Sequence, residues 1–550
     1  MGYIEGRDRQ QIMLLPDSIE ELVSEDNPVR VIDAFVDGLN IEKLGFSKDK
    51  PAETGRPAYD PRDLLKLYIY GYFNKIRSSR KLMKESQRNI ELFYLLRRLT
   101  PDFRTIADFR KENAKALKGV FREFVGICLG MNLYQKELLA IDGSKFRAVN
   151  SKANSYNQET LVKKLARIEE HISRYFADMD QLDKSETDEK KVSRTELQQR
   201  IQELRARKGT YEDYLKQLHQ SGETQILTTD PEARVMQSKD GFHCCYNVQT
   251  AVDAGSHLIA AYEVTNHPND QGLLQEVATQ TRGNLALDTI TIVADKGYEN
   301  RCDIENCVQN GIVPHVIAKY DEDERIHTLP YEEADISEEQ RQSAKPEDIQ
   351  TCLKAGVLPA CYEGSGITVE VQEQTVLSCF VLNPDGTVTC PMGQVLRRTR
   401  RRGEASCYGN REACRQCPNK CTFGKNAKKV SFGPNTQVVP VRMYGNSQFA
   451  PLPIPKDLIV SSFNHTLDRP DMVRKKVQLR IRSPESILKQ RMCLAEHPFG
   501  TVKWHHDARY LLCRGKEKAT GELGLSFLVY NLKRAIHLVG PKALIAAMSS

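Results

Sequence analysis

Two aspartates stand where short apolar runs end, and both could take part in metal-dependent chemistry. Asp142 follows residues 138–141, and Asp295 follows residues 291–294. Runs of this length and composition are typical of buried strands. Carboxylates at strand ends in one sheet can converge, and converging carboxylates bind Mg²⁺, which prefers oxygen ligands. Phosphoryl transfer uses two such ions, one for the attacking and one for the leaving oxygen. A single aspartate after a strand is more often a turn residue, so this prediction depends on the pair.

A second candidate site is a cluster of cysteines. Cys414, Cys417 and Cys421 are separated by two and three residues, and Cys390 and Cys407 lie upstream. Spacings this short allow several thiolates to bind one metal ion. A structural Zn²⁺ site and ordinary reduced thiols fit the spacing equally well, and an iron–sulfur cluster also fits the ligand types.

Basic side chains gather in two separate stretches of the chain. Residues 53–124 carry 17 Lys and Arg against 9 Asp and Glu, and residues 391–430 carry 11 against 2, whereas residues 320–350 carry 3 against 11. Separate basic blocks favour surfaces that face phosphate, and solvated faces are the alternative for each single block. The densest run is a candidate phosphate contact and consists of Arg397, Arg398, Arg400, Arg401 and Arg402.

The composition favours a globular protein with several domains. A chain of 550 residues exceeds what one core usually serves, and its net charge of +6 is too small by itself to prove a polyanionic partner. No run approaches the 18 apolar residues of a membrane span, and residues 1–11 lack the apolar core of a signal peptide. The 15 cysteines are therefore expected to be reduced thiols or metal ligands in the cytoplasm.

The elements that must position these residues follow from periodicity. Residues up to about 135 are expected to be helical, with Asp60 as an N-cap before Pro61. Strand patterns at 138–141, 289–294 and 312–318, a β-hairpin at 244–264 and helices at 273–281 and 299–310 predict a mixed α/β sheet. A short strand is expected at 375–381. From residue 471 the chain is expected to be helical, ending in an apolar helix at 525–539.

Residues 157–220 have a heptad pattern of apolar side chains. The pattern predicts two helices joined by a polar turn, which form either an antiparallel hairpin within the chain or a contact between two chains. The hairpin is the favoured alternative. The positions are Leu161, Leu165, Ile168, Ile172, Tyr175, Met179 and Leu182, then Leu197, Ile201, Leu204, Tyr211, Leu215 and Leu218, with Lys208 in one apolar slot.

Three ordered blocks resemble the catalytic blocks of bacterial insertion-sequence DDE transposases. They are Asp142-Gly143-Ser144-Lys145-Phe146 with Ala148-Val149-Asn150, then Ala294-Asp295-Lys296-Gly297-Tyr298, then Glu496-His497-Pro498-Phe499-Gly500-Thr501-Val502-Lys503. The third is similar to the branch whose signature reads Glu-His-Pro-Phe-Gly. Gly55-Arg56-Pro57 and Tyr59-Asp60-Pro61 also resemble the helical domain that precedes the core in these enzymes.

The resemblance implies roles for individual residues. Asp142, Asp295 and Glu496 would bind Mg²⁺ or Mn²⁺, and Arg491 and Lys503 would contact DNA. Leu488 stands near where relatives often have a tyrosine, which puts a tyrosine–phosphate contact in doubt. Because of Pro498 and Gly500, one continuous helix from Glu496 to Lys503 is not expected.

The resemblance also bears on the cysteines and on the single tryptophan. Relatives have a Cys-Pro pair like Cys390-Pro391, so the favoured zinc ligands are Cys390, Cys414, Cys417 and Cys421. Trp504 is either a residue that stacks on a flipped base or a core or cap residue.

The implied fold is an RNase H-like α/β core with a mixed sheet. We expect a helical DNA-binding domain at 1–135, the first part of the core at 136–319 with a helical hairpin inserted at 157–220, an acidic and then Cys/Arg-rich insertion at 320–455, and a helical part at 456–550 that completes the core.

The implied function is DNA cleavage and strand transfer by two-metal phosphoryl transfer. Its partners would be the terminal inverted repeats of the element and target DNA, bound by a homodimer that is cytoplasmic and associated with the nucleoid. The alternatives are a non-catalytic DNA-binding protein derived from a transposase and a coiled-coil assembly protein.

Overall fold

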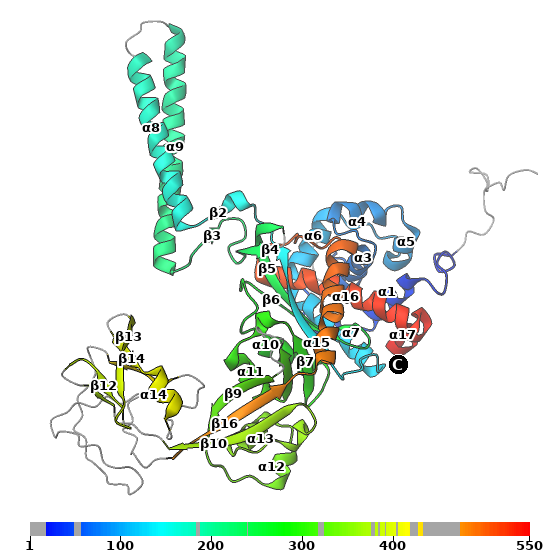
Figure 1. Cartoon of the computed structure of the whole chain (residues 1–550). Helices are drawn as coiled ribbons and strands as arrows, with labels where there is room; N and C mark the ends of the chain where they lie inside the picture. Colours follow the sequence, from blue (N-terminus) through cyan, green and yellow to red (C-terminus); the bar gives the residue numbers. More distant parts are fainter. Residues whose placement is uncertain are drawn as a thin grey trace, which may run out of the picture. The chain divides into compact units, whose positions relative to one another are not determined.

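The computed structural model describes residues 18–48, 57–182, 188–238, 240–316, 324–375, 380–382, 385–390, 392–402, 405–417, 427–432 and 473–549. The chain divides into two compact units (Figure 1). The first unit comprises Met1–Glu322 with Ser483–Ser550, and the second comprises Asp323–Arg482. Within the described ranges, none of the helices has both the length and the apolar character needed to cross a bilayer.

The first unit begins with helices, as predicted. They are α1 (Pro28–Asp37), α2 (Ile41–Leu44), α3 (Pro61–Phe73), α4 (Ser79–Ser86), α5 (Ile90–Leu96), α6 (Phe103–Glu112) and α7 (Ala114–Gly130). The expected cap is confirmed: the Asp60 side chain accepts from Arg62 N, and Pro61 opens α3. These helices do not form a unit of their own, because α3, α6 and α7 pack against the C-terminal helix α16 (Lys516–Val539). The helix α17 (Pro541–Ser549) packs against α1.

A mixed six-stranded sheet is the centre of the first unit. Its strands are β1 (Leu139–Arg147), β4 (Arg234–Ser238), β5 (Gly241–Asp253), β6 (Ile259–Thr265), β7 (Ile290–Ala294) and β8 (Ile312–Val316). The order is β4-β5-β1-β7-β8, with β6 also paired to β5. The pairs β4–β5, β5–β6 and β1–β5 are antiparallel, and β1–β7 and β7–β8 are parallel. The predicted β-hairpin, the two following strands and the helices between them, α10 (Leu274–Asn284) and α11 (Arg301–Gln309), are confirmed.

One expectation about the first strand is wrong. β1 does not end before Asp142 but continues to Arg147. Residues 142–147 stay extended because β5 pairs with the whole of β1, from Leu139 opposite Asp253 to Arg147 opposite Cys245. Asp142 therefore lies inside a strand.

Two long helices interrupt the sheet between β1 and β4. They are α8 (Gln158–Leu182) and α9 (Asp188–Ser221), preceded by the short elements η1 (Lys152–Asn154) and β2 (Ser155–Tyr156) and followed by β3 (Ile226–Leu227), which pairs with β2. They lie side by side within one chain (Figure 1). Lys208, in the apolar slot of the heptads, places its Nζ 2.9 Å from Glu169 Oε1 across the two helices.

The helix α15 (Glu485–Gly500) packs on the sheet. Leu494 and Ala495 join Leu138 and Ala140 of the β1 region and Val293 of β7 in one buried cluster. As expected, no single α-helix runs from Glu496 to Lys503, because α15 ends at Gly500; Pro498 itself lies inside the helix and does not break it. The hydrogen-bonding pattern changes only afterwards, at the π-helical turn η4 (Thr501–His505), which follows the helix directly.

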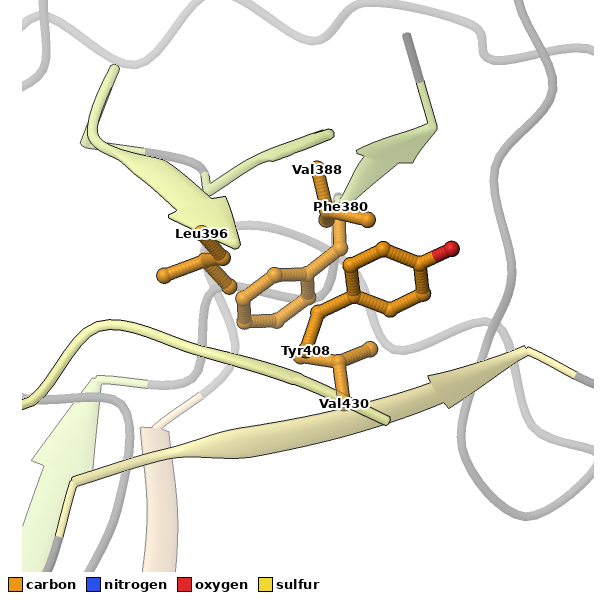
Figure 2. Packing of buried hydrophobic residues seen from close by; sticks show 5 residues of the cluster. All are labelled: Phe380, Val388, Leu396, Tyr408 and Val430. Carbon is orange, nitrogen blue, oxygen red and sulfur yellow. The ribbon is translucent and has the colours of Figure 1, made fainter. Parts of the chain in front are cut away.

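The second unit contains two further sheets. One has the order β10-β16-β9 and is formed by β9 (Glu324–Pro330), β10 (Ile367–Thr375) and β16 (Val473–Arg482), with α12 (Glu338–Gln342), α13 (Pro346–Lys354) and η3 (Ala360–Tyr362) between the first two. The other is formed by β11 (Val381–Leu382), β12 (Val388–Thr389), β13 (Val395–Arg402), β14 (Ala405–Gly409) and β15 (Lys429–Phe432), and α14 (Arg411–Gln416) follows β14. Figure 2 shows its small core of Phe380, Val388, Leu396, Tyr408 and Val430.

Two predictions of secondary structure concern residues of the second unit. Residues 471–482 were expected to be helical, but β16 is a strand, because buried Val477, Leu479 and Ile481 alternate with polar residues and a strand pairs on each side. The strand expected at 375–381 lies largely outside the described residues, which here include the end of β10 and the start of β11.

Candidate active site

The parallel register of β1 and β7 brings the two predicted aspartates together. Leu139 is paired with Ile292 and Ala140 with Val293, so continuing the register by two residues places Asp142 opposite Asp295. Both carboxylates face one cation on α15: Arg491 Nη1 lies 3.8 Å from Asp142 Oδ1 and 3.9 Å from Asp295 Oδ2. The structure therefore brings Asp142, Asp295 and Arg491 to one point.

Backbone amides orient both carboxylates. Gly143 N donates to Asp142 Oδ1 at 2.9 Å, and Gly297 N donates to Asp295 Oδ1 at 2.8 Å. A Cβ atom at Gly297 would lie 2.9 Å from Asp295 Oδ1, and a Cβ atom at Gly143 would lie 2.6 Å from Asp270 Oδ1. The first two sequence blocks thus each have a glycine where a side chain would collide with a carboxylate.

Asp270 is an acidic residue of this region that the sequence analysis missed. It follows β6, and its Oδ1 accepts hydrogen bonds from Asn247 Nδ2 at 2.7 Å and Gln249 Nε2 at 2.9 Å. Lys145 Nζ lies 3.7 Å from the same oxygen. A signal was present, because Asn247 and Gln249 are polar residues two positions apart in a strand, and both are buried.

Burial of negative charge dominates the electrostatics of the site. Burial raises the pKa of Asp142 to about 6, the Arg491 charge and the Gly143 amide oppose this change, and the charges of Asp295 and Asp270 add to it. Burial also lowers the pKa of Lys145, while the adjacent Asp270 carboxylate acts in the opposite direction. The protein alone therefore does not fully compensate the charge of Asp142.

The other residues implied by the resemblance lie along the same helix and turn. Lys503 Nζ donates to Ser144 Oγ at 2.6 Å and to the Lys145 carbonyl at 2.7 Å. Glu496 is an exposed residue of α15. Glu496 lies five positions after Arg491, which corresponds to a rotation of about 140° around an ideal helix, so the two side chains leave α15 in different directions. Among the described residues, no group of three or more His, Cys, Asp or Glu is arranged to hold a metal ion.

In the second unit, the structure describes part of the two other candidate sites. Cys390 lies in a turn where Gln394 N donates to its Sγ at 3.3 Å. Burial raises the pKa of the Cys390 thiol, and the nearby thiols of Cys417 and Cys414 contribute to this rise. Cys421 lies outside the described residues. The arginine run forms β13, where Arg397 and Arg398 are exposed, whereas the side chains of Arg400, Arg401 and Arg402 are outside the described part.

The raised pKa of Asp142 leads to a prediction about stability in the absence of divalent cations. An aspartate with a pKa of 3.8 in the unfolded chain and about 6 in the folded chain destabilises the fold when it is ionised. This penalty is absent below about pH 4, grows up to about pH 6 and is constant above. Asp142→Asn is therefore expected to increase the free energy of unfolding at pH 8, by up to about 3 kcal/mol, and by less at pH 5. Urea denaturation in EDTA at both pH values measures this. A variant that is less stable at pH 8, or an equal difference at both pH values, would contradict it.

Comparisons with known proteins agree with the geometry. A family model described as a transposase domain (DUF772) matches residues 17–112, and one described as a transposase DDE domain matches residues 134–358. No curated protein matches the chain. A solved structure, described as a cryo-EM structure of the piggyBac transposase synaptic complex with hairpin DNA, is similar at 9% identity with a TM-score of 0.26, over 95% of this chain and 79% of that one. At that TM-score the likeness carries no argument about this chain.

Proposed function

Because the chain belongs to the insertion-sequence DDE transposases, we propose that it cleaves DNA at the ends of an insertion sequence and joins those ends to target DNA. The observation that carries this proposal is the meeting of two carboxylates: the parallel register of β1 and β7 brings Asp142 of β1 near Asp295, which directly follows β7, and both face Arg491. The matched DDE domain implies an RNase H-like fold for the sheet of the first unit, and the strand order supports this.

The donor set at this point fits a divalent metal ion. Asp142 and Asp295 offer carboxylate oxygens, the ligands that Mg²⁺ and Mn²⁺ prefer, and the raised pKa of Asp142 indicates a buried charge that a further cation would stabilise. When bound, such ions activate the attacking oxygen and stabilise the leaving oxygen of a phosphodiester. Asp142 and Asp295 would hold the ions.

Glu496 is proposed as the third carboxylate on the strength of the resemblance. Its helix α15 packs on the sheet through Leu494 and Ala495, which brings the helix to the face of β1 that carries Asp142. Since Glu496 is exposed and leaves α15 about 140° away from Arg491, its role requires a rearrangement of α15 itself when DNA and metal are bound.

Two cations near the carboxylates are proposed to contact DNA phosphate. Arg491 has a buried Nε without a hydrogen-bond partner among the described residues, so its donors are not all satisfied by the protein. Lys503 is held beside β1 by Ser144 and Lys145, close to Asp142. Contacts of this kind fix the position of a DNA strand without reading its sequence.

The proposed DNA partners are the terminal inverted repeats and the target site. A transposase must hold two ends of its element together, so we also propose a homodimer on DNA. The arginine strand β13 is a further proposed phosphate contact, carried by Arg397 and Arg398 together with Arg400, Arg401 and Arg402.

A cleavage assay tests the proposed function. DNA carrying the inverted repeats that flank the gene is incubated with the full-length protein and either MgCl₂ or EDTA. We expect strand breaks at the repeat ends that leave a 3′-hydroxyl, in Mg²⁺ only. Tight DNA binding without cleavage would instead support a non-catalytic DNA-binding protein, and oligomers with neither property would support an assembly protein.

We also propose that Cys390, Cys414, Cys417 and Cys421 bind one structural Zn²⁺. This proposal rests on the spacing of the cysteines and on the resemblance. In the structure the thiols of Cys414 and Cys417 act on the pKa of Cys390 and an amide donates to Cys390 Sγ, but the three described thiols are not arranged to hold a metal ion, so zinc binding would have to draw them together. Purified protein is expected to contain about one zinc per chain by elemental analysis, and Cys417→Ser is expected to lose it.

The matched control for the zinc prediction is Cys302→Ser. Cys302 is an exposed cysteine of α11 in the first unit, so its replacement is expected to leave the zinc content unchanged. Zinc-free wild-type protein, together with unchanged stability of Cys417→Ser, would leave these residues as ordinary reduced thiols.

A further inference from the structure

A buried polar network lies behind the carboxylates of Asp142 and Asp295, on the face of β1 that points away from α15. Successive residues of a strand point to opposite faces of the sheet. Ala140 contacts α15 and Asp142 faces the same helix, so Gly143 faces the other side. Gly143 is paired with Gln249 of β5, and the Gln249 side chain is buried. The network therefore begins next to the residue that follows Asp142.

Gln249 uses both ends of its side-chain amide. Its Oε1 accepts a hydrogen bond from Tyr298 Oη, and its Nε2 donates to Asp270 Oδ1 at 2.9 Å. Asn247 Nδ2 donates to the same carboxylate oxygen at 2.7 Å. Tyr298 and Asn247 are fully buried. Because both ends of the Gln249 amide are paired, the network holds these side chains in one arrangement.

Tyr298 connects this network to the turn that orients Asp295. It ends the short 3-10 helix η2 (Lys296–Tyr298) and directly follows Gly297, whose amide donates to Asp295 Oδ1 at 2.8 Å. Burial, together with the charges of the nearby carboxylates, raises the pKa of Tyr298 well above its usual range, so its hydroxyl keeps its proton and donates to Gln249. The position of the Gly297 amide, and with it the direction of the Asp295 carboxylate, therefore depends on the bond between Tyr298 and Gln249.

Close packing leaves the network little freedom to move. A Cβ atom at Gly143 would lie 2.5 Å from Gln249 Nε2, and a Cβ atom at Gly297 would lie 3.6 Å from Asp270 Oδ2. Gln249 thus packs against the first sequence block at Gly143 and is hydrogen-bonded to the second at Tyr298. One buried side chain connects the two segments that carry the candidate metal ligands.

We propose that Gln249 and Tyr298 are positioning residues, which hold the carboxylates of Asp142 and Asp295 at the separation that binds divalent metal ions. This inference rests on the proposed function. Side chains behind metal ligands orient those ligands, and replacing such side chains typically lowers metal affinity by about 10- to 100-fold. Neither side chain contacts an ion in this role. Tyr298 acts through the turn that orients Asp295, and Gln249 acts through Tyr298 and through its contact with Gly143.

Binding of Mn²⁺ to the full-length protein without DNA tests the inference. Electron paramagnetic resonance measures the free Mn²⁺ during a titration, so the readout does not depend on cleavage. Tyr298→Phe removes only the hydroxyl that bonds Gln249. It is expected to raise the dissociation constant of Mn²⁺ by about 10- to 100-fold. An unchanged dissociation constant in this variant would overturn the proposal.

Tyr68→Phe is the matched control. Tyr68 is fully buried like Tyr298, and its hydroxyl donates to the Ile106 carbonyl at 2.6 Å within the N-terminal helices. The control therefore loses a buried hydrogen bond away from the carboxylates, and its Mn²⁺ affinity is expected to equal that of the wild type. An equal loss of Mn²⁺ affinity in Tyr68→Phe and Tyr298→Phe would also overturn the proposal.

A double variant separates positioning from stability. Gln249→Met combined with Tyr298→Phe removes both partners of the bond, and replacing both partners by apolar groups costs less stability than leaving one of them buried and unpaired. Asp270 keeps Asn247 as a donor. In urea denaturation, the double variant is expected to be more stable than Tyr298→Phe, while its Mn²⁺ binding stays weak. Recovery of Mn²⁺ affinity along with stability would assign the loss to a loosened fold and overturn the positioning role.

The outcome is separate from that of the cleavage assay. Weakened Mn²⁺ binding in Tyr298→Phe, in a protein whose wild type does not cleave DNA, would retain the positioning role and reject the catalytic proposal. Normal cleavage by the wild type, together with unchanged Mn²⁺ affinity in Tyr298→Phe, would do the reverse. Wild-type protein that binds no Mn²⁺ would overturn the positioning role.

Discussion

Asp142→Asn and Asp295→Asn are each expected to lower Mg²⁺-dependent cleavage of DNA carrying the inverted repeats by at least about 1,000-fold. Metal ions stabilise the transition state of phosphoryl transfer by several kcal/mol, and each 1.36 kcal/mol corresponds to a factor of ten in rate. An asparagine has a similar shape and can still accept the hydrogen bonds that Gly143 and Gly297 donate. It lacks the charge that holds the ion. Single-turnover cleavage on the repeat-end DNA measures the effect.

Measurements of DNA binding and of stability distinguish a loss of cleavage activity from unfolding of the variants. Both variants are expected to bind the repeat DNA nearly as tightly as the wild type. In EDTA, Asp142→Asn is expected to be more stable than the wild type, because it removes a buried carboxylate whose pKa is raised. Asp213→Asn, on the exposed surface of α9, is the control and is expected to cleave normally. Retained Mg²⁺-dependent cleavage in Asp142→Asn would reject this residue as a metal ligand, and the same result for Glu496→Gln would reject the third carboxylate.

The second large effect is expected at a buried ion pair whose two members are far apart in sequence. Glu522 of α16 is fully buried, and its Oε1 accepts from Arg77 Nη2 at 2.6 Å. The same carboxylate accepts from the backbone amides of Leu512 and Cys513. Glu522→Leu leaves the charge of Arg77 buried and unpaired, so the free energy of unfolding is expected to fall by about 3–5 kcal/mol. The unfolding transition of the first unit, followed by calorimetry, measures this fall.

A double variant and a surface control test whether the unpaired charge of Arg77 causes the loss of stability. Arg77→Met combined with Glu522→Leu removes both charges, and it is expected to be more stable than Glu522→Leu alone. Glu159→Gln breaks an exposed ion pair with Lys163 on α8 and is expected to change stability by less than about 0.5 kcal/mol. If Glu522→Leu were no more harmful than Glu159→Gln, the ion pair would not hold the N-terminal helices to α16.

Local patterns were sufficient for much of the fold. The cap at Asp60, the β-hairpin of β5 and β6, and the alternation of strands and helices through β8 depend on interactions between residues close in sequence. Asp142 and Asp295 were identified because each follows an apolar run in a recognisable block. The parallel register then determined that they are neighbours.

Tertiary structure decided the rest, because it depends on which distant segments pair. Asp142 lies inside β1 since β5 extends the strand to Arg147, and residues 473–482 form a strand because β9 and β10 flank them. Asp270 joins the site through Asn247 and Gln249, which no spacing between the blocks could indicate. Arg77 and Glu522 are 445 residues apart, and only the packing of α16 against the N-terminal helices makes them partners. A sequence pattern reports the preferences of a segment, whereas burial and charge at a site depend on every segment that meets there.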